Sequence, residues 1–246
     1  MVSPTGGVTT FGSVSNDGSL NTLGVKPGQP LVGGATTAND GGYWLVDSTG
    51  NIYTFGNAAY LGGPSQLNPS LPPGGSNAVN LKKPIVAMSP TPDSKGYYEV
   101  ASDGGVFTFG DAQFFGSMGG QPLDKPIVGI STTPDSKGYY EVASDGGVFT
   151  FGDAQFFGSM GGKPLNQPIT GIAATSDGSG YYEVASDGGV FTFGSAKFFG
   201  SAAGSATSVV VSINPTSDGN GYTEVTSNGK AFPFGDATAG LTGTTS

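Results

Sequence analysis

A unit of about 42 residues recurs along this chain, and two neighbouring copies are almost identical. Residues 84–125 and 126–167 differ at six of 42 positions, and residues 168–208 keep the segment GYYEVASDGGVFTFG unchanged. Looser copies lie on either side, at 30–83 and 209–246. Units of roughly 40 to 50 residues that hold four short strands are typical of β-propeller blades. The repeat therefore constrains the architecture much more than the function.

Strand and turn signals alternate within one unit, as residues 126–167 show. Runs of apolar and aromatic residues predict four strands, named a to d in chain order, at 126–131, 139–144, 148–151 and 155–159. Residues 133–138 have turn composition, and Asp145-Gly146-Gly147 predicts a tight hairpin because glycine tolerates positive φ. Such a meander exposes apolar faces, so neighbouring units must stack on it.

The N-terminus carries half of a unit. Residues 7–12 align with strand c, and residues 18–24 align with strand d. Because a propeller can close its ring with a blade shared between the termini, we predict that residues 8–11 or 19–23 pair in the same sheet as residues 222–234. Strand c of the last unit contains Pro233, which fits badly inside a ladder.

The predicted fold class is all-β, with residues 1–246 forming a single five-bladed β-propeller domain. Its blades are expected to be four-stranded and antiparallel, with the ring closed by strands from both termini. The predicted parts are a half-unit at 7–29 and blades at 30–83, 84–125, 126–167, 168–208 and 209–246. A β-trefoil would need three units rather than five. A stacked solenoid remains an alternative, although it would favour polar caps at both ends.

The absence of three residue types limits the possible chemistry. The chain has no Cys, no His and no Arg, and all nine basic residues are Lys. It therefore lacks disulfides, thiolate metal sites, and the commonest general base and metal ligand. A net charge of -9 without a basic stripe argues against nucleic acid as a partner, and no apolar run is long enough to predict membrane insertion. We expect no cofactor and no metal, and a monomeric chain that binds a glycan or a surface protein.

The four glutamates of the chain occupy one position of strand b, where the first unit has Leu45. They are Glu99, Glu141, Glu183 and Glu224. They could bind cations or hydroxyl-rich ligands, or they could form hydrogen bonds between blades. Unpaired buried carboxylates cost several kcal/mol each, against a typical stability of about 5–15 kcal/mol. The carboxyl groups must therefore be hydrogen-bonded, partly exposed or protonated, and we predict a structural carboxylate ring held by hydrogen bonds within or between blades.

The same equivalence argues against catalysis. A glycosidase needs an acid and a base or nucleophile in different environments, whereas near-identical units give every glutamate the same surroundings. The chain also lacks a nucleophile elbow and an SxxK motif. We predict no catalytic residue and no enzymatic activity.

Two repeated sets are candidates for ligand binding. The first is aromatic and shares one strand b position: Trp44, Tyr98, Tyr140 and Tyr182. The second consists of the hairpin aspartates Asp103, Asp145 and Asp187. Aromatic faces stack on sugars and carboxylates accept hydroxyl protons, although core packing and turn formation explain both sets as well. In the Phe-Phe pairs of strand d, one ring should pack between blades and the other should point outward.

The alternation of strands and connections predicts two different faces of the ring. The b–c turns and the d–a connections share one face, while the a–b and c–d turns share the other. The first d–a connection, residues 63–83, is about a dozen residues longer than its counterparts. We expect it to cap the central channel or to contact a partner.

The repeat resembles one found in known proteins. GYWLVDSTGNIYTFGNA at 42–58 and GYYEVASDGGVFTFGDAQFFGS at 96–117 are similar to a repeat of secreted and cell-surface bacterial proteins, notably actinobacterial ones. The resemblance covers residues 30–235. It implies a β-propeller that is secreted or at the cell surface, often beside cell-wall or adhesion modules. A five-bladed ring is also similar to tachylectin-type lectins, in architecture only.

These observations lead to one function and two alternatives. We expect a non-enzymatic binding or adhesion module with weak, multivalent, lectin-like binding of a cell-surface or cell-wall carbohydrate. The first alternative is a structural scaffold that docks other proteins within a larger surface protein. The second is a glycoside hydrolase.

Overall fold

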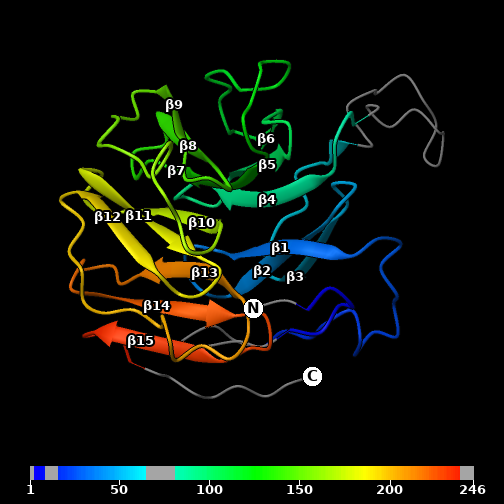
Figure 1. Cartoon of the computed structure of the whole chain (residues 1–246). Coiled ribbons are helices and arrows are strands. Elements are labelled where there is room, and N and C mark those ends of the chain that lie inside the picture. The colour runs from blue at the N-terminus through cyan, green and yellow to red at the C-terminus, as the bar shows by residue number, and fades with distance from the viewer. Residues whose placement is uncertain (1–2, 9–15, 65–80, 239–246) are drawn as a thin grey trace.

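The computed structural model describes residues 3–8, 16–64 and 81–238. In these ranges the chain forms five three-stranded antiparallel sheets and no α-helix, and each sheet lies within one of the five predicted units (Figure 1). The first sheet consists of β1 (Leu31–Thr36), β2 (Gly42–Asp47) and β3 (Ile52–Gly56), and the second of β4 (Ile85–Pro90), β5 (Gly96–Ala101) and β6 (Val106–Gly110). The third consists of β7 (Ile127–Thr132), β8 (Gly138–Ala143) and β9 (Val148–Gly152), and the fourth of β10 (Ile169–Ala174), β11 (Gly180–Ala185) and β12 (Val190–Gly194). The fifth consists of β13 (Val210–Pro215), β14 (Gly221–Thr226) and β15 (Ala231–Gly235).

Strands a, b and c therefore form as the alternation predicts. In the third sheet, every residue of the central strand β8 is buried, because sheets pack on both of its faces. The Asp-Gly-Gly hairpin between β8 and β9 also forms, with Gly146 at φ 79°, a region that favours glycine. A bulge between Ile127 and Gly129 shifts the register at the start of β7, and the other four sheets repeat it.

The sheets are arranged around a centre, with the first strand of each sheet innermost (Figure 1). The inner strands lie side by side in the order β1, β4, β7, β10 and β13. Among the described residues, no comparable contact joins β13 back to β1. This repeated arrangement fits a β-propeller, but the inner strands themselves do not form a closed ring.

The predicted fourth strand is absent from the described residues, which corrects the expectation of four-stranded blades. The segment that follows β6 runs along the next sheet instead. There the Phe115 N–H donates to the Tyr139 hydroxyl at 3.2 Å, and that hydroxyl donates to the Gly116 carbonyl. Gly116, at φ 122°, interrupts an extended conformation. Because a side chain satisfies its backbone groups, this segment, called the d segment, needs no ladder of its own.

Both faces of each sheet take part in inter-sheet cores. We call the face that packs on the following sheet the front and the opposite face the back. In β8, for example, Tyr140 and Val142 point forward onto Tyr181, while Tyr139 points back onto Tyr98. Four equivalent apolar cores join the first sheet to the second, the second to the third, the third to the fourth and the fourth to the fifth.

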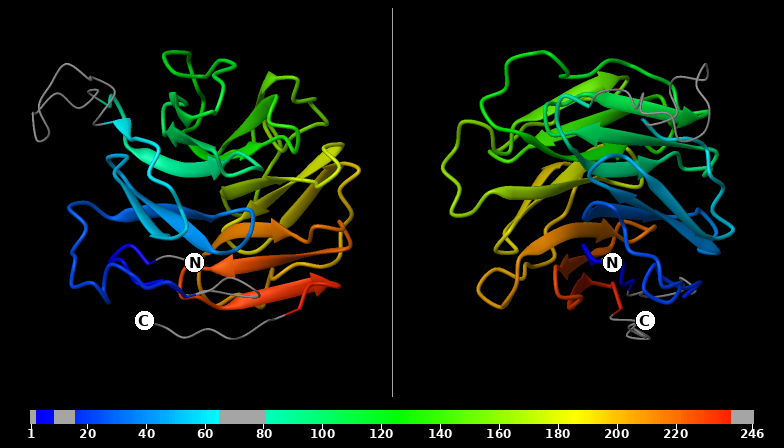
Figure 2. Two further views of the ribbon diagram at one scale, coloured as in Figure 1. Left: turned by 180° about the vertical axis from the view of Figure 1, so that it is seen from behind. Right: turned by 90° about the vertical axis from the view of Figure 1, so that its right-hand side faces the viewer.

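A fifth core joins the N-terminal half-unit to the back of the first sheet. Val8 and Leu20 pack there with residues of the first sheet that include Tyr43 and Leu45. The Tyr43 hydroxyl donates to the Gly18 carbonyl, as Tyr139 does to Gly116. The half-unit thus occupies the position that the second half of a preceding unit occupies elsewhere. In Figures 1 and 2 this dark blue segment lies beside the first sheet, on the side toward the fifth.

The backbone of the half-unit follows the repeat in register. The Leu31 N–H donates to the Pro4 carbonyl, as Ile127 N–H does to the Ser102 carbonyl in the later units. The predicted closure by strand pairing is nevertheless wrong for the described residues, because the fifth sheet contains only β13, β14 and β15. Residues 20–24 form a turn rather than a strand. Residues 9–11 of the predicted pairing segment lie outside the described residues.

Two further predictions can be compared with the structure. Strand c of the fifth sheet forms as β15 despite Pro233, because it is an edge strand whose outer side forms no ladder. The assignment of turns to faces is confirmed: the Gly161 N–H of a d–a connection donates to Gly146 of a b–c turn, and the Asp153 N–H of a c–d turn donates to Lys137 of an a–b turn. Most of the long connection, at 65–80, lies outside the described residues. No helix in the described part of the chain is long and apolar enough to cross a membrane.

The position of the half-unit predicts that two leucines three residues apart contribute very differently to the stability of the fold. Leu20 is 2% exposed in the fifth core, whereas Leu23 is 66% exposed. Leu20→Ala should lower the free energy of unfolding by about 2–5 kcal/mol because it removes buried methyl groups and leaves a cavity. Leu23→Ala should change it by less than about 0.5 kcal/mol. Urea unfolding measures both values, and equal effects would show that the half-unit is only an appendage.

Candidate functional site

The aromatic set predicted in strand b lies in the core. Trp44, Tyr98, Tyr140 and Tyr182 are at most 1% exposed. Each packs on the back-face tyrosine of the next sheet, with ring centroids 4.9 to 5.8 Å apart. Two of them also anchor the d segment of their own unit, as the Trp44 Nε1–H donates to Ala59 at 2.7 Å and the Tyr98 hydroxyl to Gln113 at 3.1 Å, whereas the Tyr140 hydroxyl has no hydrogen-bond partner among the described residues. No ring face is open to a ligand, and these residues are not part of the site we propose.

The hairpin aspartates Asp103, Asp145 and Asp187 are half-buried on the face that carries the b–c turns. In each, Oδ1 accepts the N–H of the second glycine of the turn at 3.0 to 3.1 Å. This local hydrogen bond explains aspartate at the position without a ligand. Asp187 also borders a cavity of about 180 Å³ with Leu165 and Phe191.

The predicted ring of glutamates lies at the four interfaces between consecutive sheets. All four side chains are fully buried on the back face of strand b, beside the b–c turn of the preceding unit. A Cβ on Gly104 would lie 2.8 Å from Oε2 of Glu141, so glycine in the turn makes room for the carboxyl group. Oε1 of Glu224 accepts the Ala202 N–H at 3.0 Å, and Oε1 of Glu183 accepts the Met160 N–H at 3.4 Å. Both oxygens of Glu99 and of Glu141 have no hydrogen-bond partner among the described residues, so the predicted hydrogen bonds are wrong for these two glutamates.

Burial changes the protonation of these carboxyl groups. Desolvation, together with the charge of Asp47, raises the pKa of Glu99 to about 9. Desolvation likewise raises the pKa of Glu141 and of Glu183 to about 8, and that of Glu224 to about 7. At neutral pH most of this ring is therefore neutral, which does not suit it to hold a cation.

One of the five sheets has an apolar residue at the position that glutamate occupies in the other four. Leu45 replaces glutamate in the first sheet and is 3% exposed in the core shared with Leu20 and Val8. Gly34 lies opposite Leu45 in the register, at the position where Ile130 lies opposite Glu141. The same backbone therefore accommodates an apolar side chain at this position when the residue opposite it in the sheet is glycine.

A different repeated set of aromatic rings reaches solvent. Phe114, Phe156 and Phe198 are each 59% exposed, and Tyr60 occupies the same position of the first unit at 48% exposure. The second rings of the pairs pack inward, since Phe115, Phe157 and Phe199 contact the back-face tyrosine of the next sheet. The predicted split of each pair is therefore confirmed. Sequence reasoning did not identify Tyr60, although alignment of the units places it beside the phenylalanines.

A polar turn cluster lies at the a–b and c–d turns, just before each exposed ring. In the second unit Thr91 Oγ1 donates to Asp93 at 2.9 Å and lies 3.5 Å from Asp111, and the Lys95 ammonium is 2.9 Å from Asp93. Bonds from Lys95 and Thr91 lower the pKa of Asp93 to about 2, so it is ionised at neutral pH. Phe114 follows Asp111 by three residues.

The cluster recurs with changes. In the first unit two amides replace the carboxylates, and Asn57 donates to Asn39 at 2.9 Å. In the fourth unit the Ser195 hydroxyl donates to Asp177 at 3.2 Å. Exposed rings therefore alternate around the molecule with groups that donate and accept hydrogen bonds. Among the described residues there is no group of three or more acidic side chains that could hold a metal ion.

Comparison with known proteins found no family model that matches the chain and no curated protein similar to it.

The buried carboxyl groups predict that stability depends on pH. The pKa of Glu141 rises from 4.5 in the unfolded chain to about 8 in the folded protein, so the unfolded chain releases its proton first as pH rises. The stabilisation is complete below about pH 4.5 and is lost as pH rises through about 8. Unfolding free energy should therefore fall between pH 5 and pH 8. Glu141→Leu should reduce that slope by about 1 kcal/mol per pH unit.

Leu45→Glu is the matched counterpart, because it places a carboxyl group at the equivalent position of the first sheet. It should steepen the fall of stability with pH. Chemical denaturation at pH 5, 6, 7 and 8 measures both slopes. An unchanged slope in Glu141→Leu would mean that this carboxyl group ionises freely in the folded protein.

Proposed function

We propose that the chain is a non-enzymatic, multivalent carbohydrate-binding module with the five-bladed β-propeller architecture, acting at a cell surface or in the secreted space. The observation that carries the proposal is the recurrence of one exposed aromatic ring in four consecutive units, at Tyr60, Phe114, Phe156 and Phe198. Soluble proteins bury most large aromatic side chains, and exposed apolar groups in a regular pattern mark binding surfaces.

The groups around each ring suit a sugar. The ring supplies a flat apolar face for the C–H face of a pyranose, while the neighbouring turn supplies hydroxyl, carboxylate or amide groups for its hydroxyls. In the third unit these are Phe156 and the turn cluster of Thr133 and Asp135, in which Thr133 Oγ1 donates to Asp135 at 2.9 Å. Each such site is small and open, so its own affinity would be weak.

Repetition on a rigid scaffold compensates for weak single sites. Equivalent sites on successive sheets engage a polymeric or clustered ligand together, which raises the overall affinity without new contacts. The similarity of the repeat to those of secreted and cell-surface bacterial proteins supports a cell-surface or cell-wall glycan as the ligand. We infer no catalysis, because the glutamates are equivalent to one another and buried.

Stepwise removal of the rings tests the proposal. Variants with one, two and three of the substitutions Phe114→Ala, Phe156→Ala and Phe198→Ala should bind an immobilised glycan progressively less, by about tenfold or more per ring. Their Tm should stay close to that of the parent because the rings are mostly exposed. The measurement is a glycan array followed by surface plasmon resonance on the best glycan.

Val209→Ala removes a 49% exposed apolar side chain that is not part of the repeated set, and it should bind like the parent. Folded protein that binds no glycan on the array would contradict the proposal. The second candidate, a protein-docking scaffold, would then be favoured, because exposed aromatic rings are also enriched in protein interfaces. Turnover of glycoside substrates by the parent protein would instead favour a hydrolase.

A further inference from the structure

The repeat pattern is broken on one face of one sheet. In the first four sheets a large front-face aromatic pairs across the strands with a small residue, as Tyr140 pairs with Ser131 in the third. In the fifth sheet the same pair is Thr223 and Asn214. The aromatics are at most 1% exposed, whereas Thr223 is half-buried and Asn214 is exposed. The front of the fifth sheet also contributes to none of the five apolar cores.

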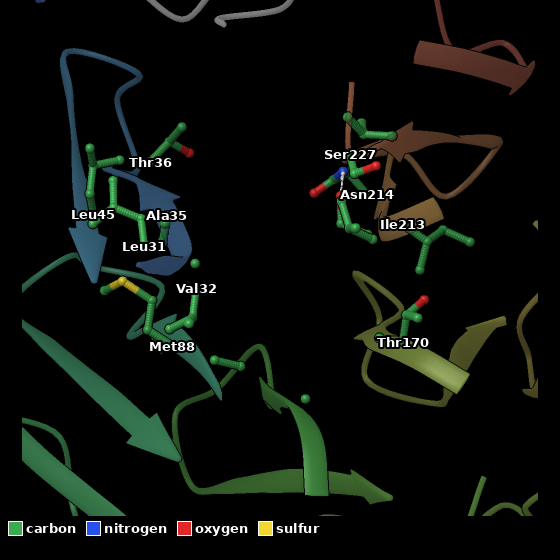
Figure 3. Close-up of a pocket in the computed structure, with 18 of the residues that line it drawn as sticks. Leu31, Val32, Ala35, Thr36, Leu45, Met88, Thr170, Ile213, Asn214 and Ser227 are labelled. Carbon is green, nitrogen blue, oxygen red and sulfur yellow. Dashed lines mark hydrogen bonds between the residues drawn. The ribbon is translucent and has the colours of Figure 1, made fainter. Parts of the chain in front are cut away.

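This face borders a cavity of about 900 Å³. The cavity runs along the inner strands and is bounded on the other side by the first sheet and the N-terminal half-unit. Figure 3 shows the two walls: Leu31, Val32 and Leu45 lie on one side, and Asn214 and Ser227 lie on the other. None of the residues that line the cavity is charged.

The two walls differ in chemistry. The wall of the first sheet offers mainly apolar groups, since Val32 and Ala35 are half-buried there, whereas Leu31 and Leu45 are buried. The wall of the fifth sheet carries hydroxyl and amide groups, and Asn214 Nδ2 donates to Ser212 at 3.3 Å. The side chains of Thr223 and Ser227 make no hydrogen bond within the described part of the chain. They are therefore available to a ligand, and the volume is in the range of small-molecule sites.

Even the looser first unit keeps an aromatic residue at this position, Trp44, which makes the change to Thr223 in the fifth unit informative. In the other four units the front aromatic fills the space between sheets, because each packs on the back-face tyrosine of the next sheet. Threonine at the fifth position forgoes that packing and leaves a polar, accessible wall. A unit that lacks a stabilising residue kept by the other units indicates that this position has a role other than packing.

We propose that this cavity binds one neutral amphipathic glycoside, with the sugar hydroxyls on Asn214, Thr223 and Ser227 and the apolar aglycone against Val32 and Ala35. A charged ligand would find no counter-charge in the cavity, and a purely apolar one would leave the polar wall unsatisfied. The site is single and lies away from the repeated rings Phe114, Phe156 and Phe198. It stands whether or not those rings bind glycans.

Octyl β-D-glucoside, used below its critical micelle concentration, is a suitable probe because it is neutral and combines a sugar with an apolar alkyl chain. Titration calorimetry of the full chain should show one saturable site with a Kd of about 0.1–1 mM. Thr223→Tyr restores the repeat residue and fills the cavity, so it should weaken binding at least about tenfold. Asn214→Ala, a change at an exposed side chain, should weaken binding about fivefold while the Tm is retained.

Val209→Ala, which changes an exposed apolar side chain outside both the repeated rings and the cavity, should leave this binding unchanged. Asn166→Ala, at an exposed position outside the cavity, should also leave it unchanged. No saturable binding by the parent up to about 10 mM would overturn the proposal. Binding that survives Asn214→Ala and a folded Thr223→Tyr undiminished, or that is lost in Val209→Ala, would overturn it as well.

Discussion

The structure depends on one interaction that recurs at every interface. In it, the hydroxyl of a buried tyrosine forms hydrogen bonds with the backbone of the preceding unit. In each case the hydroxyl accepts one backbone N–H of the preceding d segment and donates to the carbonyl of the glycine that follows that residue, as Tyr97 does with Leu61 at 3.2 Å and Gly62 at 2.6 Å. The other three tyrosines are Tyr139, Tyr181 and Tyr222. Burial raises the pKa of Tyr139 and of Tyr181 to about 12, so the donor stays protonated. The same rings form the aromatic pairs between sheets. One tyrosine side chain thus packs between two sheets and also forms the hydrogen bonds with the d segment that pairing as a fourth strand would otherwise supply.

The carboxyl groups beside these tyrosines show what burial requires of a polar group. Glu141 lies two residues from Tyr139 on the same face of β8, and its pKa of about 8 keeps it mostly neutral at neutral pH. A neutral carboxyl group costs far less to bury than a carboxylate. This explains how the molecule accommodates four of them without a basic partner for each. Where Leu45 takes the position, the N-terminal half-unit supplies Leu20 as an apolar neighbour.

Sequence patterns predicted much of the fold and less of the site. Strands a to c and the Asp-Gly-Gly hairpins follow from alternation and glycine chemistry, which are local properties. The d segment was wrongly predicted as a strand because Phe156-Phe157 looks like one, while the hydroxyl of Tyr181, in the next unit, satisfies its backbone. Trp44 was a candidate for ligand binding as well as for core packing, because its repeat position does not show that both faces of β2 are covered. The fifth-sheet change to Thr223 was visible in the alignment, but its meaning required the cavity beside it.

The central claim is that the N-terminal half-unit uses the same interaction as the complete units. The most direct test compares Tyr43→Phe with Tyr139→Phe, since each removes only the hydroxyl that bonds to Gly18 or to Gly116. We predict that both variants lose about 1–3 kcal/mol of unfolding free energy in urea, because each leaves buried backbone groups unsatisfied. A loss in Tyr139→Phe with none in Tyr43→Phe would contradict the account, because the half-unit would then not complete the fifth interface.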